Sequence, residues 1–574
     1  MALSARSNAF LHGHQGFCKI THTLLITFEE MQDKPQRRAP SNAQKCGHLV
    51  DRCFNQTRGN THGTKLRLTC APLGTNPKRT FGPMTPTSAL LISLAYIALL
   101  FTVSRWSSSS NSGDSESTFF VAGKKAPWMV VAFGMVGASL SGVTFLSIPG
   151  WVNTQEWTYM QMVVGYCIGY LIVATVLLPI YYNKKLTSIY GYLGERFGVH
   201  AHKTGAFFFL LSRIVGASFR LFLVALVLDV LVLEPLHGGE TPWTWFGGVT
   251  AAILAVIYTY TRNSGMGTVI WTDTLQTTCM LAAVIMTVVG ILSYSGQSVW
   301  ELPDALRQSN LTRIWVLDDW KASNHWVKHV LAGMFVTIAM TGLDQDMMQK
   351  NLACKGIREA QWNMGVFTAI LVGANLLFLT MGSLLWMHAE QIGMTLPDAT
   401  DRLYAMVAMG GSLGPWLGVA FLVGLLASAF SSADSALTAL TTSTCVDLLD
   451  TPKLEKLRQV SIRKRVHLFL TIGLWLVILA FRAVNDTSVV AALFTVANYT
   501  YGPLLGLFIA GIFTRLHPKG TWIPFVCVAS PLAGYLLEAC MSTQFGFSFG
   551  FALLPVNGLL TLIGLFLISR REAT

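Results

Sequence analysis

One apolar segment, residues 421–447, carries residue types that could bind a metal cation, and it is long enough to cross a bilayer as a helix. Its hydroxyl residues recur at steps of three and four, so they share one helix face, and Asp434 lies at the edge of that face. Oxygen atoms suit a hard cation such as Na+, and burying them in hydrocarbon is costly unless something binds them. The hydroxyl residues are Ser428, Ser431, Ser432, Ser435, Thr438 and Thr442.

Two further apolar segments contain residues that interrupt helices. Segment 127–150 holds Gly142 and Pro149, and segment 326–344 ends in TIAMTGLDQD, with Gly342 at the interruption. They are first and sixth in the series of apolar segments that begins at residue 127, so they occupy corresponding places in two five-helix halves. Paired interrupted helices predict a midplane transport site lined by free backbone carbonyls. Close helix packing is the other explanation for such small residues.

Few ionisable residues lie within the apolar segments, and each is expected to face the protein interior because a charge is costly in hydrocarbon. Arg213 and Arg220 are seven residues apart, on one helix face. Asp229 is expected to neutralise one of them, although substrate contact explains the two arginines equally well. Asp273 is expected near the cytoplasmic boundary, and Asp346 is expected to be a solvated residue at a helix end.

The composition predicts an all-α polytopic membrane protein. Hydrophobic residues make up 52% of the 574 residues and charged residues only 12%, against about a quarter in soluble domains. The alternating short strands of a membrane barrel do not occur in the sequence. Thirteen spans are predicted, at 88–106, 127–150, 157–181, 204–234, 243–261, 268–295, 326–344, 363–388, 410–442, 464–482, 488–514, 521–540 and 550–569.

Several other functions are not expected. The ten cysteines show no CxxC or His/Cys ligand spacing, which argues against a zinc site or a disulfide framework. No GxxxxGK[ST] loop for ATP and no nucleophile–His–Asp set stands out, so we predict neither an ATP-driven pump nor an enzyme. Lys and Arg are not clustered, so nucleic-acid binding is not expected either.

Loop charges predict the orientation, because basic loops favour the cytoplasm. With alternating spans, basic loop residues that include Lys350 fall on one side, which places the C-terminus inside and the N-terminus outside. Residues 1–83 carry 12 Lys and Arg against 4 Asp and Glu, which runs against this rule for an external arm. We therefore expect the native start at Met84 and a disordered or non-native extension before it. A genuine soluble tail is the alternative.

Several motifs together resemble the sodium/solute symporter family, whose members carry sugars, sialic acid, proline, iodide and monocarboxylates. The similarity runs from about residue 118 to 569, with one departure at Ser264–Gly265, where a glycine pair is usual. The motifs are FFVAGKKAPWM, GASLSGVTFLSIPG, GYLGERFG, YTYTRNSGMGTVIWTDTLQT, LDQDMMQKNLACK, SSADSALTALTTSTCVDLL and TYGPLLGLFIAGIFT.

The resemblance implies an inverted-repeat fold of the leucine-transporter type. Ten core helices would lie within 127–514, the first repeat in 127–296 and the second in 326–514. They would be flanked by an extra helix and a Ser-rich cytoplasmic linker within 84–126, and by two helices within 515–574.

The resemblance also implies one Na+ site between the first and eighth core helices. Its ligands would be the carbonyls of Gly137, Leu140 and Ser428 and the hydroxyls of Ser431 and Ser432.

Some members of the family hold a second Na+, and the corresponding residues here are Asp273, Asp434 and Ser435. Asp434 replaces a hydroxyl, which would put two carboxylates near one cation. The alternative is that Asp434 forms a hydrogen-bonded gate or pairs with a basic residue.

The implied solute site resembles the sialic acid carriers at Ser139, Ser141 and Thr144. Ser139 stands where proline carriers have an aspartate, which disfavours proline. Arg220 is a candidate partner for a solute carboxylate. The residues expected to complete the cavity are Tyr159, Gln161, Arg220, Asp344, Gln345 and Asn498.

The expected function is sodium-coupled symport of a sugar, sialic acid or organic anion by alternating access, with Na+ as the coupling ion and no cofactor. The expected partners are Na+, the solute and the lipid bilayer, and the functional unit is expected to be a monomer in the cell membrane. A sodium-stabilised facilitator or channel and a nutrient sensor of the same fold are the alternatives.

Overall fold

The structure is a computed structural model that describes residues 85–110, 116–318, 320, 322, 324–396, 400–484 and 489–569. The predicted N-terminal extension over residues 1–83 lies outside the described residues, and so do residues 111–115 of the Ser-rich linker.

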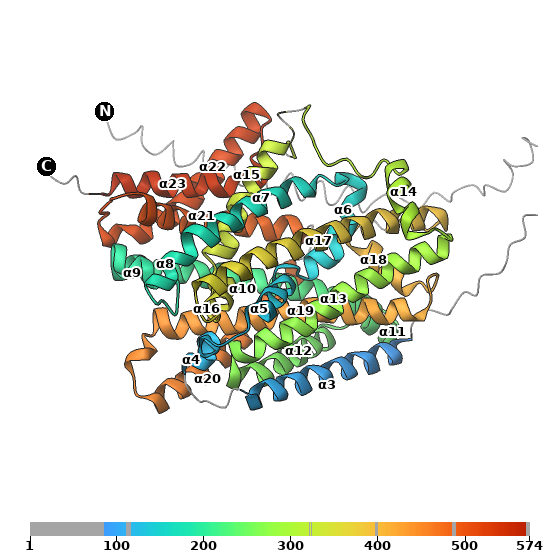
Figure 1. The fold of residues 1–574 in the computed structure, drawn as a ribbon, viewed down its shortest axis with the longest axis horizontal. Helices are drawn as coiled ribbons and strands as arrows, with labels where there is room; N and C mark the ends of the chain where they lie inside the picture. Colours follow the sequence, from blue (N-terminus) through green and yellow to red (C-terminus); the bar gives the residue numbers. More distant parts are fainter. Residues whose placement is uncertain are drawn as a thin grey trace, which may run out of the picture. The chain divides into compact units, whose positions relative to one another are not determined.

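Regular secondary structure in the described ranges is helical, with two isolated β-bridges besides (Figure 1). The helices are α3 (Pro86–Ser110), α4 (Glu116–Val121), α5 (Trp128–Ser139), α6 (Gly142–Gln155), α7 (Tyr159–Ile172), α8 (Leu178–Asn183), α9 (Gly191–Phe197), α10 (Val199–Leu228), α11 (Glu234–His237), α12 (Trp243–Ser264), α13 (Met266–Ser295), α14 (Leu302–Gln308), α15 (Trp326–Thr337), α16 (Gln345–Leu352), α17 (Ile357–Gln391), α18 (Leu403–Met409), α19 (Pro415–Ser443), α20 (Lys456–Val484), α21 (Val489–Phe513), α22 (Ile523–Phe545) and α23 (Leu553–Leu567).

The predicted membrane architecture is confirmed. Eleven of the described helices are long and apolar enough to cross a membrane, and two bent helix pairs bring the candidate spans to thirteen. Each of the thirteen coincides with a predicted span, although helix ends differ by several residues. The differences reach eight residues at the start of the tenth span, where α20 begins at Lys456 instead of 464, and at the end of the seventh, where α16 ends at Leu352 instead of 344.

Both predicted interruptions are bends. The chain turns by 59° between α5 and α6, because Leu140 (φ −84°, ψ 82°) and Ser141 (φ −78°, ψ 176°) leave the helical conformation. The second bend is 64°, between the π-helical turn that ends α15 and the start of α16. Asp344 is extended there, and its side chain accepts a hydrogen bond from the Asp346 amide at 2.9 Å, which caps α16.

The first bend lies among the helices at the centre of the described unit. α5 packs against α13, α17 and α19, and α19 in turn packs against α10 and α13. The same packing brings α16, the segment after the second bend, against α5 and α19. The hydroxyl-bearing helix therefore contacts segments from both bent spans.

Helix α7 of the first repeat packs closely against α15 of the second repeat. Glycines on both helices lie at the crossing, with almost no side chain between the two backbones. A Cβ on Gly165 would collide with the Val330 carbonyl, and a Cβ on Gly333 would collide with the Met162 carbonyl. Small residues at such crossings let backbones approach closely.

Gly165→Ala should therefore lower the stability of the protein by about 1–3 kcal/mol, because backbone atoms cannot move aside as a flexible side chain can. Thermal unfolding of the purified protein in detergent measures this. Gly290→Ala is the matched control, since Gly290 lies within α13 with open space around its Cβ position. The control should melt at or above the wild-type temperature, and equal melting of both variants would contradict the packing argument.

Candidate functional site

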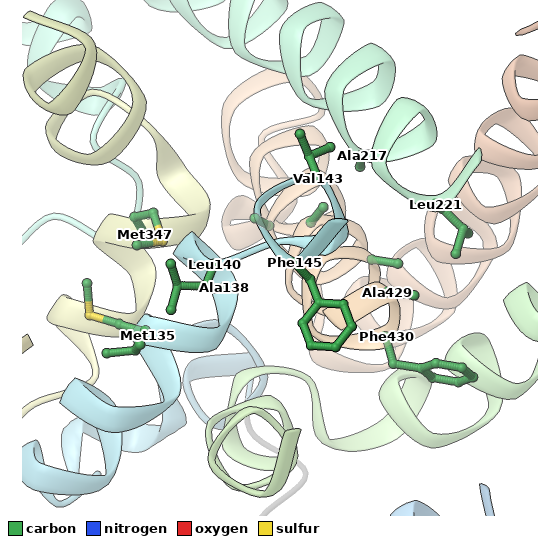
Figure 2. Packing of buried hydrophobic residues seen from close by; sticks show 14 of the residues in the cluster. Met135, Ala138, Leu140, Val143, Phe145, Ala217, Leu221, Met347, Ala429 and Phe430 are labelled. Atoms are coloured by element: carbon green, nitrogen blue, oxygen red, sulfur yellow. The ribbon is translucent and has the colours of Figure 1, made fainter. Parts of the chain in front are cut away.

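The bend between α5 and α6 lies directly against the hydroxyl face of α19. A Cβ placed on Gly137 would lie 3.3 Å from Ser431 Oγ, and one placed on Gly142 would lie 3.4 Å from Ser428 Oγ. The backbone at the bend therefore lies in contact range of the serines, and the missing side chains leave room for Thr277 of α13 beside Gly137 and for Val224 of α10 beside Gly142. Figure 2 shows apolar residues around this contact, from α5 (Met135, Ala138), the bend (Leu140), α6 (Val143, Phe145) and α19 (Ala429, Phe430).

Three of the buried α19 hydroxyls have no hydrogen-bond partner, those of Ser431, Ser432 and Thr438, and the first two lie nearest the bend in the sequence. Ser431 Oγ and Ser432 Oγ are both buried and unpaired, whereas Ser428 Oγ donates to the Leu425 carbonyl of its own helix at 2.7 Å. A buried polar group without a partner costs about 1–3 kcal/mol. The cost is recovered if an oxygen-seeking ion binds between the hydroxyls and the bend.

The backbone at the bend supplies carbonyl oxygens to the same place. The last four carbonyls of a helix have no partner within it, and the Val136 carbonyl is satisfied by the Leu140 amide at 2.8 Å. The carbonyls that follow Val136 belong to the last turn of α5, next to the bend. Hydroxyl and carbonyl oxygens, without thiolate or imidazole, form a donor set that fits a hard cation such as Na+.

The residues considered for a second cation are partly occupied by the protein itself. Asp273 Oδ2 accepts a hydrogen bond from Ser435 Oγ at 3.0 Å and lies 2.7 Å from the Lys350 ammonium. Lys350 is only 1% exposed, so the sequence-based placement of this residue in a solvated loop is wrong. The second bend directs its helix, α16, into the protein interior. A count of loop charges along the sequence does not detect such a bend.

Asp434 forms a hydrogen-bonded junction between helices. One carboxylate oxygen accepts hydrogen bonds from the Tyr260 hydroxyl at 2.7 Å and the Thr272 hydroxyl at 3.3 Å, and the other accepts the Ser435 amide at 2.6 Å. This geometry corresponds to the hydrogen-bonded alternative for Asp434. The carboxylate thereby connects α12, α13 and α19.

A second cluster of buried charged residues lies at the second bend and connects it to α10 and α21. Arg213 Nη2 lies 2.9 Å from Asp344 and 2.7 Å from Asp346, and Asp344 also accepts a hydrogen bond from Tyr501. Asp346 is 2% exposed, so the expectation that it is solvated is wrong.

The expectation that Asp229 neutralises one of the two arginines is also wrong. Asp229 pairs with Arg482 at 3.0 Å, because α20 packs against α10 and brings its own basic residue.

A cavity of about 130 Å³ opens beside the bend. Five of the nine predicted solute-site residues line it, namely Ser139, Ser141, Thr144, Tyr159 and Arg220. Arg213, for which substrate contact was one alternative, lines the cavity as well. The polar lining residues that were not predicted for the solute site are Ser147, Tyr166, Tyr170, Thr337, Thr341 and Asn375.

The sequence does carry a signal for part of this lining. Tyr159, Tyr166 and Tyr170 are spaced by seven and four residues, which places them on one face of a helix. Thr337 and Thr341 are four residues apart and immediately precede the second bend.

Arg220 is the unusual member of the lining. No carboxylate among the described residues lies within ion-pair distance of it, and its buried Nε has no hydrogen-bond partner. Arg213, seven residues earlier, has two carboxylate partners. A guanidinium that faces a cavity without an acidic partner can pair with an anion that enters the cavity.

The other four predicted solute-site residues are not part of the cavity lining, and their side chains bond elsewhere. Gln161 donates to the Thr158 and Asn324 carbonyls, and Gln345 bonds the backbone of Thr187 and Ile189.

The remaining two follow the same pattern. Asp344 pairs with Arg213, and Asn498 donates to the Gly550 carbonyl at 3.3 Å.

The end of α6 is covered by a short turn, Thr400–Arg402. A Cβ on Gly150 would meet the Thr400 carbonyl, so the turn sits on the helix without an intervening side chain. Burial raises the pKa of the Asp401 carboxyl, and the nearby Ser147 side chain opposes this shift. Because Ser147 also lines the cavity, the turn lies close to one end of the cavity.

Two bent spans at corresponding places in an all-helical membrane protein, with an oxygen-lined pocket at the first bend, are the features of an ion-coupled secondary transporter. A family model confirms this class: the sodium:solute symporter family matches residues 119–522. The chain belongs to this family. Its members are transporters, which agrees with the expectation that the chain is not an enzyme, and membership indicates sodium-coupled symport across a membrane.

Similar proteins support the assignment of the chain to this family. The chain is 24% identical over 410 residues to the sodium/sialic acid symporter NanT of Aliivibrio fischeri, covering 70% of this chain and 78% of the relative. It is 23% identical over 469 residues to the sodium/sialic acid symporter SiaT of Proteus mirabilis, covering 78% and 87%. The solved structure of a Na+-coupled sialic acid symporter, in a substrate-bound outward-open state, superposes with a TM-score of 0.67 at 19% identity, covering 85% of this chain and 99% of that one. This likeness confirms the predicted fold.

Asp229→Asn should lower the stability of the protein by about 3 kcal/mol, because it leaves the largely buried Arg482 without its carboxylate. Asp318→Asn is the matched control, since the Asp318–Arg313 pair has the same chemistry and lies in solvent, where such a pair contributes at most about 1 kcal/mol. Thermal unfolding in detergent compares the two. Equal melting temperatures would contradict the assignment of Arg482 as the partner of Asp229.

Proposed function

We propose that this protein couples the entry of Na+ to the uptake of a small organic anion by alternating access. The observation that carries the proposal is that the hydroxyls of Ser431 and Ser432 are buried and unpaired, with Ser431 beside Gly137 of the bent first core span. Family membership supports the sodium coupling, and the cavity beside the bend supports a solute site adjacent to the ion.

Na+ binds to the carbonyls of Gly137, Leu140 and Ser428 and to the hydroxyls of Ser431 and Ser432. These ligands belong to α5 with its bend and to α19. The ion therefore connects two helices whose facing carbonyl and hydroxyl oxygens otherwise lack hydrogen-bond partners. The bound ion stabilises the outward-open arrangement, in which the cavity beside the bend is shaped for the solute. Ion and solute then favour each other's binding to the same extent, because coupling between two sites is reciprocal.

The solute carries a carboxylate that pairs with Arg220. A guanidinium binds a carboxylate through two parallel hydrogen bonds, and such charge-assisted bonds are about twice as strong as neutral ones. The hydroxyls of Ser139, Ser141 and Thr144 line the same cavity and bind polar groups elsewhere on the solute. The sialic acid carried by the named relatives is an organic anion of this kind.

The remaining steps follow from the two bends. Once Na+ and the anion are bound, the bent spans rock against the surrounding helices and the site opens to the cytoplasm. We place the C-terminus in the cytoplasm, since the basic loops favour that side. A single chain forms both sites, so the functional unit is a monomer in the cell membrane.

The solute is identified by thermal-shift measurements on the purified protein against sugars, sialic acids, amino acids, monocarboxylates and vitamins, each with and without Na+. A carboxylate that stabilises the protein only when Na+ is present is the expected result. Stabilisation by neutral sugars alone would contradict the anion assignment, and stabilisation that ignores Na+ would indicate a facilitator.

Ser431→Ala and Ser432→Ala should each raise the half-saturating Na+ concentration severalfold, because each removes one oxygen ligand. The measurement is a Na+ titration of solute uptake into proteoliposomes, or of thermal stability before the solute is known. Ser428→Ala is the matched control on the same helix face, because the Ser428 hydroxyl is engaged with the Leu425 carbonyl and only its backbone is assigned to the ion. Wild-type Na+ dependence in both test variants would show that the ion binds elsewhere.

Arg220→Gln should weaken solute binding about 10- to 100-fold, because it removes a charge-assisted contact. The same change should leave the Na+-induced thermal shift in place and should raise the melting temperature of the solute-free protein, since an unpaired guanidinium is costly to bury. Arg220→Lys keeps the charge but not the paired hydrogen bonds, and an intermediate loss is expected. Unchanged solute affinity in Arg220→Gln would refute the carboxylate contact.

A further inference from the structure

A buried ammonium occupies the place where a second cation would bind. Lys350 reaches inward from α16, and its Nζ lies 2.7 Å from Asp273 Oδ2 on α13. Asp346 Oδ1 lies 3.9 Å from the same ammonium, and Ser435 donates to the same Asp273 oxygen at 3.0 Å. The lysine, the aspartates and the serine are each buried, with exposures of 2% or less.

The other carboxylate of the region is satisfied without a metal ion. Asp434 accepts two hydroxyl hydrogen bonds and one amide hydrogen bond, from Tyr260, Thr272 and Ser435. Its oxygens are thus held by donors of the protein itself. Of Asp273 and Asp434, Asp273 is the carboxylate whose charge needs a nearby cation, and the Lys350 ammonium is that cation.

We propose that the Lys350 ammonium is a built-in cation for Asp273 that excludes a second Na+, so that each chain binds a single Na+, at the bend between α5 and α6. The inference rests on the proposed function, since it assigns the stoichiometry of the same transport cycle. A Na+ ion next to Asp273 would have to displace the ammonium or sit beside it, and two like charges at such short range in a buried site repel strongly.

The lysine is suited to this role because of its chemistry. An ammonium is a compact point charge on a flexible stem, so it can approach one carboxylate oxygen closely as a bare cation does. It is also covalently attached, so it remains beside Asp273 whatever the Na+ concentration. Lys350 is therefore a residue that determines how many ions drive the cycle.

The test is the number of radiolabelled Na+ ions bound at saturation by the purified full-length protein in detergent, which requires no solute. One ion per chain is expected for the wild type and for Lys350→Arg, which keeps the charge. Lys350→Gln removes the cation and should bind two ions per chain. Adding Asp273→Asn to Lys350→Gln should return the number to one, because the carboxylate is then gone as well.

The outcomes separate this inference from the function on which it rests. Two ions bound by the wild type would overturn the role of Lys350 and leave the sodium-coupled function standing. A single ion bound by folded Lys350→Gln would overturn it too. No bound ion in the wild type would overturn the proposed function together with this inference. If Lys350→Gln fails to fold, the wild-type number still decides the proposal.

Discussion

The structure depends on one constraint: polar groups buried at membrane depth must find partners within the protein or in what it binds. The bend between α5 and α6 releases backbone carbonyls, and α19 presents Ser431 and Ser432 without hydrogen-bond partners. Gly137 and Gly142 border the contact between the bend and α19, and a side chain at either position would collide with Thr277 of α13 or Val224 of α10. An ion at this contact satisfies both sets of oxygens, and its departure leaves both unsatisfied. The same contact can therefore bind the ion and change the stability of the bent span when the ion binds or leaves.

The buried charges follow the same logic. The carboxylates of the central region are compensated, by Lys350 for Asp273, by Arg213 for Asp344 and Asp346, and by hydroxyl and amide donors for Asp434. Arg220 is the charged group that faces the cavity without such a partner. If one Na+ and a monoanionic solute move together, as proposed above, the transported pair carries no net charge; the sodium concentration gradient would then supply the driving force and the membrane potential would add nothing.

Local pattern was enough to predict the spans, both bends and the hydroxyl face of α19, since each depends on residues of one continuous segment of the chain. Partners across the bundle were harder. Asp229 and Arg213 lie on one helix, which suggested a pair, yet Arg482 and the two carboxylates near the second bend come from segments remote in the sequence. Lys350 was predicted to be a charged loop residue because its helix is short and polar. The 64° bend before that helix directs Lys350 into the protein interior.

The central claim is that Na+ binds at the contact between the first bend and α19. Hydrogen–deuterium exchange of the purified protein tests it most directly, in NaCl, KCl and choline chloride at equal ionic strength. We expect backbone amides over residues 137–145 and in the middle of α19 to exchange more slowly in NaCl than in the other two salts. Identical exchange of these amides in all three salts would contradict it.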